Sequence, residues 1–218
     1  FKEYFFNNDY IMIKLFIFFL LSLFPSCNSQ LYSNDIIFLI DSSPSNLNSK
    51  KCDNNEAIRN FTSDFVLNLK NFNFYYASLQ YNYRGYIDIP FNSNYSIVYN
   101  SLKNYNFINE GPTLLHTGLD KITYLYTLFE HTPKNILLIL ISDGSSLNTL
   151  NIIESLKLYP FNSNIFNTIL INIDSHFKSN YVIYNIFNDS LKFEINCNSK
   201  FDIFNIIDNS FIKYYFTT

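Results

Sequence analysis

The chain has 218 residues, a length that suits one large α/β domain or two small ones. Hydrophobic residues make up 48% of it, charged residues make up 15%, and the formal net charge is −3. Because the charge is mild and no basic stripe runs through the sequence, we expect no nucleic acid among the partners of this protein.

Residues 12–29 have the layout of a secretory signal peptide. Lys14 gives a short basic start, 15–24 is mainly apolar, and 25–29 offers small residues before a cleavage point at Gln30. The apolar run is shorter than the ~20 residues that span a bilayer. We therefore predict a signal peptide over 12–29, an upstream extension or translation artefact over 1–11, and a secreted protein without a membrane segment after cleavage.

The first part of the remaining chain predicts a buried strand followed by a helix. Asp35–Asp41 contains an apolar run without polar alternation, which is typical of a strand buried on both faces. From Ala57 to Leu69, apolar residues recur at helical spacing, which predicts a helix that packs on the sheet.

A β-hairpin is predicted next, with strands over 74–81 and 86–90. Gly85 is expected in its turn, and Pro90 at the end of the second strand marks that strand as an edge.

The later predicted elements are helices over 96–103 and 114–129, a strand over 135–141, a helix over 147–158, a strand over 165–173, a helix over 181–187, a strand over 192–196 and a helix over 201–215. This alternation predicts one α/β domain over 33–215, with a doubly wound, mostly parallel sheet, one antiparallel edge strand and helices on both faces.

Three loops are expected to meet at the carboxyl end of this sheet, where open α/β sheets bind ligands. They are 41–45, 110–117 and 142–145, and they offer two carboxylates together with serine and threonine hydroxyls. Oxygen ligands of this kind favour Mg²⁺, Ca²⁺ or Mn²⁺ over zinc or copper. The alternative is that Asp41 and Asp143 are helix N-cap acids that bind no metal.

With these motifs, the chain resembles the von Willebrand factor A (VWA) domain, also called the integrin I domain, over nearly all of 33–215. The first motif is the strand that ends in Asp41-x-Ser43-x-Ser45. The second is the loop from Gly111 through Thr113 to Thr117 and Gly118, and the third is the strand 136–143 that ends in Asp143-Gly144. The three motifs occur in the order that the family has them.

The resemblance implies a Rossmann-like fold with a metal-ion-dependent adhesion site (MIDAS). Ser43 and Ser45 would bind Mg²⁺, or Ca²⁺ or Mn²⁺, through their hydroxyls, and Asp41 and Asp143 would act directly or through waters. Thr113 would join them when ligand is bound. The family keeps one coordination position for a carboxylate of a protein or extracellular-matrix ligand, which implies cell adhesion as the role.

The threonine loop departs from the commonest family pattern. Many members have Thr-x-Thr-Gly, and alignment on Thr117 and Gly118 would place Leu115, which cannot ligate, at the metal position. A longer spacing places Thr113 there, and we favour Thr113 over Thr117. The departure motivates an alternative, a structural or interaction domain whose site is degenerate and metal-free.

We predict that the protein is not an enzyme. His116 is a lone histidine on an early helical turn, and no Ser/His/Asp or Cys/His order accompanies it. The sequence also lacks a P-loop, a GxSxG and an HExxH motif. A metal-assisted hydrolase is the last-ranked alternative.

Two kinds of covalent modification fit a secreted chain. Cys27 would leave with the signal peptide, so Cys52 and Cys197 could form a disulfide in an oxidising compartment, the alternative being two free buried thiols. Glycosylation sequons begin at Asn60, Asn94 and Asn188. Asn60 falls on a predicted helix, so we favour Asn94 and Asn188.

Overall fold

The computed structural model describes residues 33–44, 54–129, 132–172, 182–187 and 190–194. All of them belong to one compact unit, Tyr32–Thr218. Several predicted features lie outside the described residues and stay predictions: the extension 1–11, the signal peptide 12–29, Ser45, Cys52, Cys197, Asn188 and the helix over 201–215.

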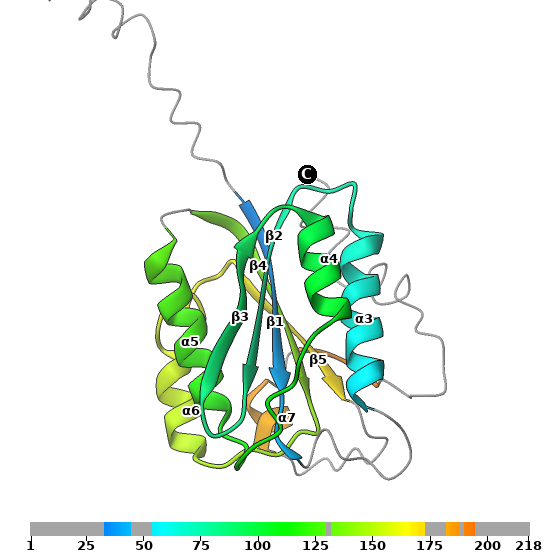
Figure 1. Ribbon diagram of the computed structural model, residues 1–218. Coiled ribbons are helices and arrows are strands. Elements are labelled where there is room, and N and C mark those ends of the chain that lie inside the picture. The colour runs from blue at the N-terminus through cyan, green and yellow to red at the C-terminus, as the bar shows by residue number, and fades with distance from the viewer. Residues whose placement is uncertain (1–32, 45–53, 130–131, 173–181, 188–189, 195–218) are drawn as a thin grey trace, which may run out of the picture. The chain divides into compact units, whose positions relative to one another are not determined.

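A six-stranded sheet forms the centre of the fold, in the order β3-β2-β1-β4-β5-β6 (Figure 1). Its strands are β1 (Ser33–Asp41), β2 (Phe74–Tyr81), β3 (Gly85–Asn92), β4 (Pro133–Ser142), β5 (Phe166–Asn172) and β6 (Leu191–Glu194). All neighbours pair in parallel except β3, which lies antiparallel to β2 at the edge. The predicted doubly wound, mostly parallel sheet with one antiparallel edge strand is therefore confirmed.

Helices cover both faces of the sheet (Figure 1). The helices are α3 (Asn54–Asn68), α4 (Tyr95–Lys103), α5 (Leu115–Leu128), α6 (Thr149–Leu156) and α7 (Val182–Ile186). One hydrophobic cluster joins α3 and α4 to one face, and a second cluster joins α5, α6 and α7 to the other. Within the described residues, no helix has the length and apolar character that crossing a membrane requires.

The central strand β1 supplies both clusters, because successive side chains of a strand point to opposite faces. Ile36, Phe38 and Ile40 pack toward α3 and α4, and Phe38 meets the ring of Phe65 edge-on at 5.8 Å. Ile37 and Leu39 pack toward α5 on the other face. Complete burial of each such side chain contributes about 1.5–3 kcal/mol. This packing fixes the point at which β1 ends and Asp41 emerges.

The hairpin differs from its prediction at Gly85 and Pro90. Gly85 is the first residue of β3 rather than part of the turn. A Cβ there would lie 2.1 Å from the carbonyl oxygen of Thr117, so the close approach of α5 requires the glycine. Pro90 does not end β3, which continues to Asn92. The pairing with β2 shifts by one residue next to Pro90, and such a β-bulge accommodates a residue without a backbone N–H.

The helix predicted over 147–158 is shorter in the structure, where α6 runs from Thr149 to Leu156. It starts late because Asn148 has a φ of 60°, a left-handed conformation that cannot belong to a right-handed helix. The segment between Asp143 and α6 is therefore a loop, which lengthens the polar edge of the sheet.

Candidate metal centre

Asp41 is the last residue of β1, and its side chain is completely buried. Its Oδ1 accepts a hydrogen bond of 3.0 Å from the backbone N–H of Ser43, because the chain turns directly after the strand. Its Oδ2 accepts a hydrogen bond of 3.1 Å from the hydroxyl of Ser142, the last residue of the neighbouring strand β4. The carboxylate is thus held from both strands that end at this edge.

Asp143 follows β4 directly and is half-buried. Its Oδ1 accepts the backbone N–H of Ser145 at 2.9 Å and the Ser145 hydroxyl at 2.6 Å. Gly144 takes a φ of 89°, which allows the sharp turn that follows. The N-cap of α6 is Asn148, so the alternative that Asp143 caps this helix is wrong.

The two acids interact electrostatically. Burial, followed by the negative charge of Asp143, raises the pKa of Asp41 to about 7. Hydrogen bonds from Ser43 and Ser142 act against this rise by stabilising the charged form. A buried carboxylate beside a second carboxylate is unfavourable by itself, and a divalent cation between them would reverse the sign of that interaction. The chemistry of this donor set therefore fits a hard, oxygen-coordinated cation.

Hydroxyl groups accompany the acids. Ser43 is completely buried, and its side chain hydrogen-bonds to Asp41. Thr113 is 8% exposed, and its backbone carbonyl accepts the N–H of Leu147 at 3.0 Å. That hydrogen bond ties the threonine loop to the loop after Asp143. Ser45, the remaining predicted ligand, lies outside the described residues.

The other candidate hydroxyl in the threonine loop is engaged elsewhere. The hydroxyl of Thr117 donates to the carbonyl of Leu114 at 2.8 Å, within the first turn of α5. Leu115 is completely buried in the cluster between α5 and the sheet, so its side chain serves packing. Thr113 stays the predicted metal ligand of this loop.

Two polar residues at this edge had no role in the sequence prediction. Ser142 is the hydroxyl donor to Asp41, and Asn82 is completely buried just after β2. The Nδ2 of Asn82 donates to the Ser42 hydroxyl at 3.3 Å, and its backbone carbonyl accepts the N–H of Leu114 at 2.9 Å. Asn82 thereby joins β1, the hairpin and the threonine loop. Asn82 directly follows β2, a strand parallel to β1, and this position in the sequence could have predicted that it lies at the same edge of the sheet.

Within the described residues, no group of three or more histidine, cysteine, aspartate or glutamate side chains is placed to hold a metal. The predicted centre needs only two acids, because its other protein ligands are hydroxyl oxygens.

Two of the three predicted glycosylation sites are among the described residues. Asn94 is exposed and caps α4 by accepting the N–H groups of Ser96 and Ile97. Asn60 is half-buried on α3, where its Oδ1 accepts the Nζ of Lys103 at 2.6 Å.

The model of the von Willebrand factor type A domain family matches residues 35–184, which is more than half of the chain. The chain belongs to the VWA family. The match includes β1 from Asp35 onward, the threonine loop and β4, and therefore every described residue of the candidate centre. Comparison of this VWA domain with curated proteins gives no match.

Solved structures agree with the family assignment. BatB, a conserved hypothetical protein from Bacteroides thetaiotaomicron, is 12% identical with a TM-score of 0.60, and the match covers 81% of this chain and 96% of BatB. Proximal thread matrix protein 1 from the mussel byssus is 18% identical with a TM-score of 0.61, covering 85% of this chain and 47% of that protein. At these identities the likeness shows the fold.

A second structure of the mussel protein was determined with a zinc-occupied MIDAS motif. It is 16% identical to this VWA domain with a TM-score of 0.59, and the match covers 83% of this chain and 45% of that protein. Divalent-metal binding at the MIDAS is thus a property found within the family to which the chain belongs.

Proposed function

We propose that this VWA domain binds a divalent cation, Mg²⁺ or else Ca²⁺ or Mn²⁺, and uses it to capture a carboxylate of a protein or extracellular-matrix ligand. The observation that carries the proposal is the pair of acids at the ends of two adjacent strands, Asp41 and Asp143. Asp41 is completely buried, and the charge of Asp143 contributes to its raised pKa. Such a pair gains stability from a cation that neutralises both carboxylates.

Each residue of the candidate metal centre has a role in this proposal. Ser43 and Thr113 would supply hydroxyl oxygens, as would Ser45 beyond the described residues, while Asp41 and Asp143 would supply charge directly or through waters. Mg²⁺ takes six oxygens in near-octahedral geometry and usually keeps waters or external oxygens among them. A ligand carboxylate would occupy such a position. The protein would be secreted, in keeping with the signal peptide predicted over 12–29.

The proposed role is binding rather than catalysis. Hydroxyl groups among the described residues of this edge donate to carboxylates and backbone carbonyls, as the Ser142 hydroxyl does to Asp41. This arrangement suits holding a cation and a ligand in place.

Thermal unfolding with and without metal tests the proposal. A cation that binds only the folded protein stabilises it by about 2.7 kcal/mol at a concentration of 100 Kd, which corresponds to a rise in melting temperature of roughly 5–10 °C. Asp41→Asn and Asp143→Asn should each abolish this rise. Asp64→Asn, a half-buried acid on α3, should retain it. Equal melting temperatures in EDTA and in millimolar Mg²⁺, Ca²⁺ or Mn²⁺ would favour the metal-free interaction domain instead.

Ligand binding is tested on the same variants. Binding to immobilised extracellular-matrix proteins should require the cation and disappear in EDTA, and it should be lost in Asp143→Asn and kept in Asp64→Asn. Binding that continues unchanged in excess EDTA contradicts a ligand held through the metal.

A further inference from the structure

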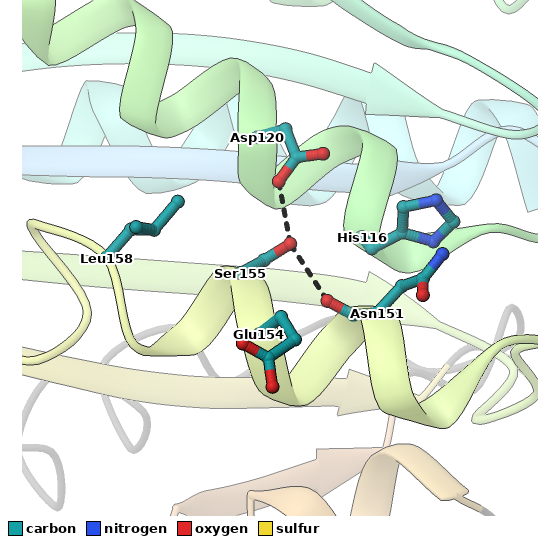
Figure 2. A pocket seen from close by; sticks show the side chains of 6 residues that line it. All are labelled: His116, Asp120, Asn151, Glu154, Ser155 and Leu158. Carbon is teal, nitrogen blue, oxygen red and sulfur yellow. Dashed lines mark hydrogen bonds between the residues drawn. The ribbon is translucent and has the colours of Figure 1, made fainter.

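A cavity of about 340 Å³ lies between α5 and α6 (Figure 2). It is lined by His116, Asp120, Asn151, Glu154, Ser155 and Leu158. Its volume is at the lower end of the range of small-molecule sites, which suits a single side chain or a small ligand. None of its lining residues belongs to the predicted metal ligands.

The carboxylate of Asp120 lines this cavity and is oriented by a hydrogen bond from the protein. The hydroxyl of Ser155 lies 2.6 Å from Oδ1 of Asp120 and donates to it across the two helices (Figure 2). Ser155 is only 5% exposed, and its hydroxyl also lies 3.0 Å from the backbone carbonyl of Asn151. Asp120 itself is an exposed residue. The carboxylate is therefore oriented by the protein while it stays accessible to a ligand.

The lining carries a negative charge. Asp120 and Glu154 are its two acids, and no lysine or arginine is among the lining residues. Lys157 pairs with Glu154 at 2.7 Å, but the two side chains are 62% and 70% exposed. An ion pair at such an exposed position is weak and offers little competition to a ligand cation. The cavity thus attracts positive charge.

The two ends of the cavity differ in character (Figure 2). At one end, His116 has a buried Nδ1 without a hydrogen-bond partner among the described residues. Because this atom is closed to solvent, a ligand at this end would contact the exposed part of the imidazole ring. At the other end, Leu158 offers an apolar surface of a side chain that is 48% exposed. An elongated ligand with a polar head and methylene groups matches both ends.

We infer that this cavity binds an arginine side chain of a partner protein. The planar guanidinium group carries five N–H donors, which suit bidentate pairing with the Asp120 carboxylate, and its face can stack on an aromatic ring such as that of His116. The methylene groups would pack along Leu158. The inference does not depend on the proposed metal centre.

The probe for this inference is N-acetyl-arginine amide, with the uncharged N-acetyl-citrulline amide as its matched control. Amide chemical shifts are followed by NMR in EDTA, so that the candidate metal centre takes no part. We expect saturable shifts in 115–121 and 150–158 with the arginine probe, and at least tenfold weaker binding of the citrulline probe. Absence of saturable shifts, or equal binding of both probes, overturns the inference.

Variants test the contacts. Asp120→Asn should weaken binding of the arginine probe at least tenfold, because the asparagine can still accept the Ser155 hydroxyl but carries no charge. Glu154→Gln should weaken it about threefold, and Asp64→Asn on α3 should leave it unchanged. The melting temperature of each variant in EDTA reports whether it is folded. Unchanged binding by a folded Asp120→Asn variant overturns the inference, whatever the result of the metal experiments.

Discussion

The central strand β1 carries a buried acid near each end, and the two acids have opposite surroundings. Asp35, near its start, is completely buried and accepts the Ser33 hydroxyl at 2.7 Å and the Tyr126 hydroxyl at 2.7 Å. Asp41, at its end, is equally buried but lies within the electrostatic influence of Asp143. Hydroxyl groups donate to the carboxylate of Asp35, whereas a second acid, Asp143, lies close enough to Asp41 to raise its pKa.

This difference separates a structural acid from a candidate ligand. Burial, followed by the charge of Asp35 and its hydrogen bond, raises the pKa of Tyr126 well above the usual range, so that Tyr126 stays a donor. Asp35 thereby joins β1 to α5 without needing a cation. At Asp41, the donors Ser43 and Ser142 only reduce an unfavourable interaction that a cation would remove. Burial alone therefore does not distinguish a candidate metal ligand from a structural acid. The groups that surround each carboxylate make the distinction.

The largest expected effect on stability is at Asp35. In the Asp35→Ala variant, the buried hydroxyls of Ser33 and Tyr126 lose their acceptor, and we expect the free energy of unfolding to fall by about 3 kcal/mol. Chemical denaturation measures this loss. The metal-induced rise in melting temperature should persist, and its disappearance in a folded Asp35→Ala variant would show that the two ends of β1 are not independent. Asp64→Ala serves as the control, with a change within about 0.5 kcal/mol.

The second prediction concerns pH in the absence of metal. Burial and the charge of Asp143 raise the pKa of Asp41 to about 7 in the folded protein, from an ordinary value of 3.8. Between these two values the folded state binds more protons than the unfolded state, so stability is greatest at low pH and is lost as the pH rises toward 7. From pH 5 to pH 7 this contribution is on the order of 2 kcal/mol.

Denaturation in EDTA at several pH values, compared between the wild type and Asp41→Asn, isolates this contribution. The variant lacks the titrating group, so the difference between the two proteins should change with pH in the stated direction. Identical pH profiles would mean that neither burial nor the proximity of Asp143 raises the pKa of Asp41 in the folded protein. Excess Mg²⁺ should flatten the wild-type profile at neutral pH, because the cation favours the ionised carboxylate.

The smallest expected effects come from single hydroxyls. Ser142→Ala removes a donor to Asp41, and Ser33→Ala removes a donor to Asp35, so each should cost about 1 kcal/mol of stability. Only Ser142→Ala should also weaken the affinity for Mg²⁺, by several-fold, because its hydroxyl orients a proposed ligand. Calorimetric titration of both variants measures this contrast. Equal Mg²⁺ affinities for the two variants would count against an orienting role of Ser142.

Much of the fold could be predicted from two uninterrupted apolar runs. The runs 36–40 and 136–141 lack alternation because β1 and β4 are covered on both faces, and parallel strands place the residues after them at one edge. This reasoning correctly placed Asp41 and Asp143 together. It could equally have placed Asn82, which follows another parallel strand, but its amide side chain gave no metal-ligand signal.

The remaining features depend on contacts between distant parts of the sequence. Gly85 is required by the approach of Thr117 on α5, and the position of Pro90 depends on a bulge against β2. The partner of Asp35 is Tyr126 on another element, so the apolar pattern around Asp35 gave no sign of its role. The cavity at Asp120 exists only because α6 packs beside α5. Local patterns do not carry such information.

The placement of β1 also has a consequence for hydrogen exchange. Its side chains from Ile36 to Ile40 are completely buried and alternate between the two hydrophobic clusters, and its backbone pairs with β2 and β4 on both sides. No local opening can expose these amide protons without separating both clusters at once. They should therefore exchange with deuterium only through global unfolding, and any cation held at Asp41 should slow the exchange of the whole strand.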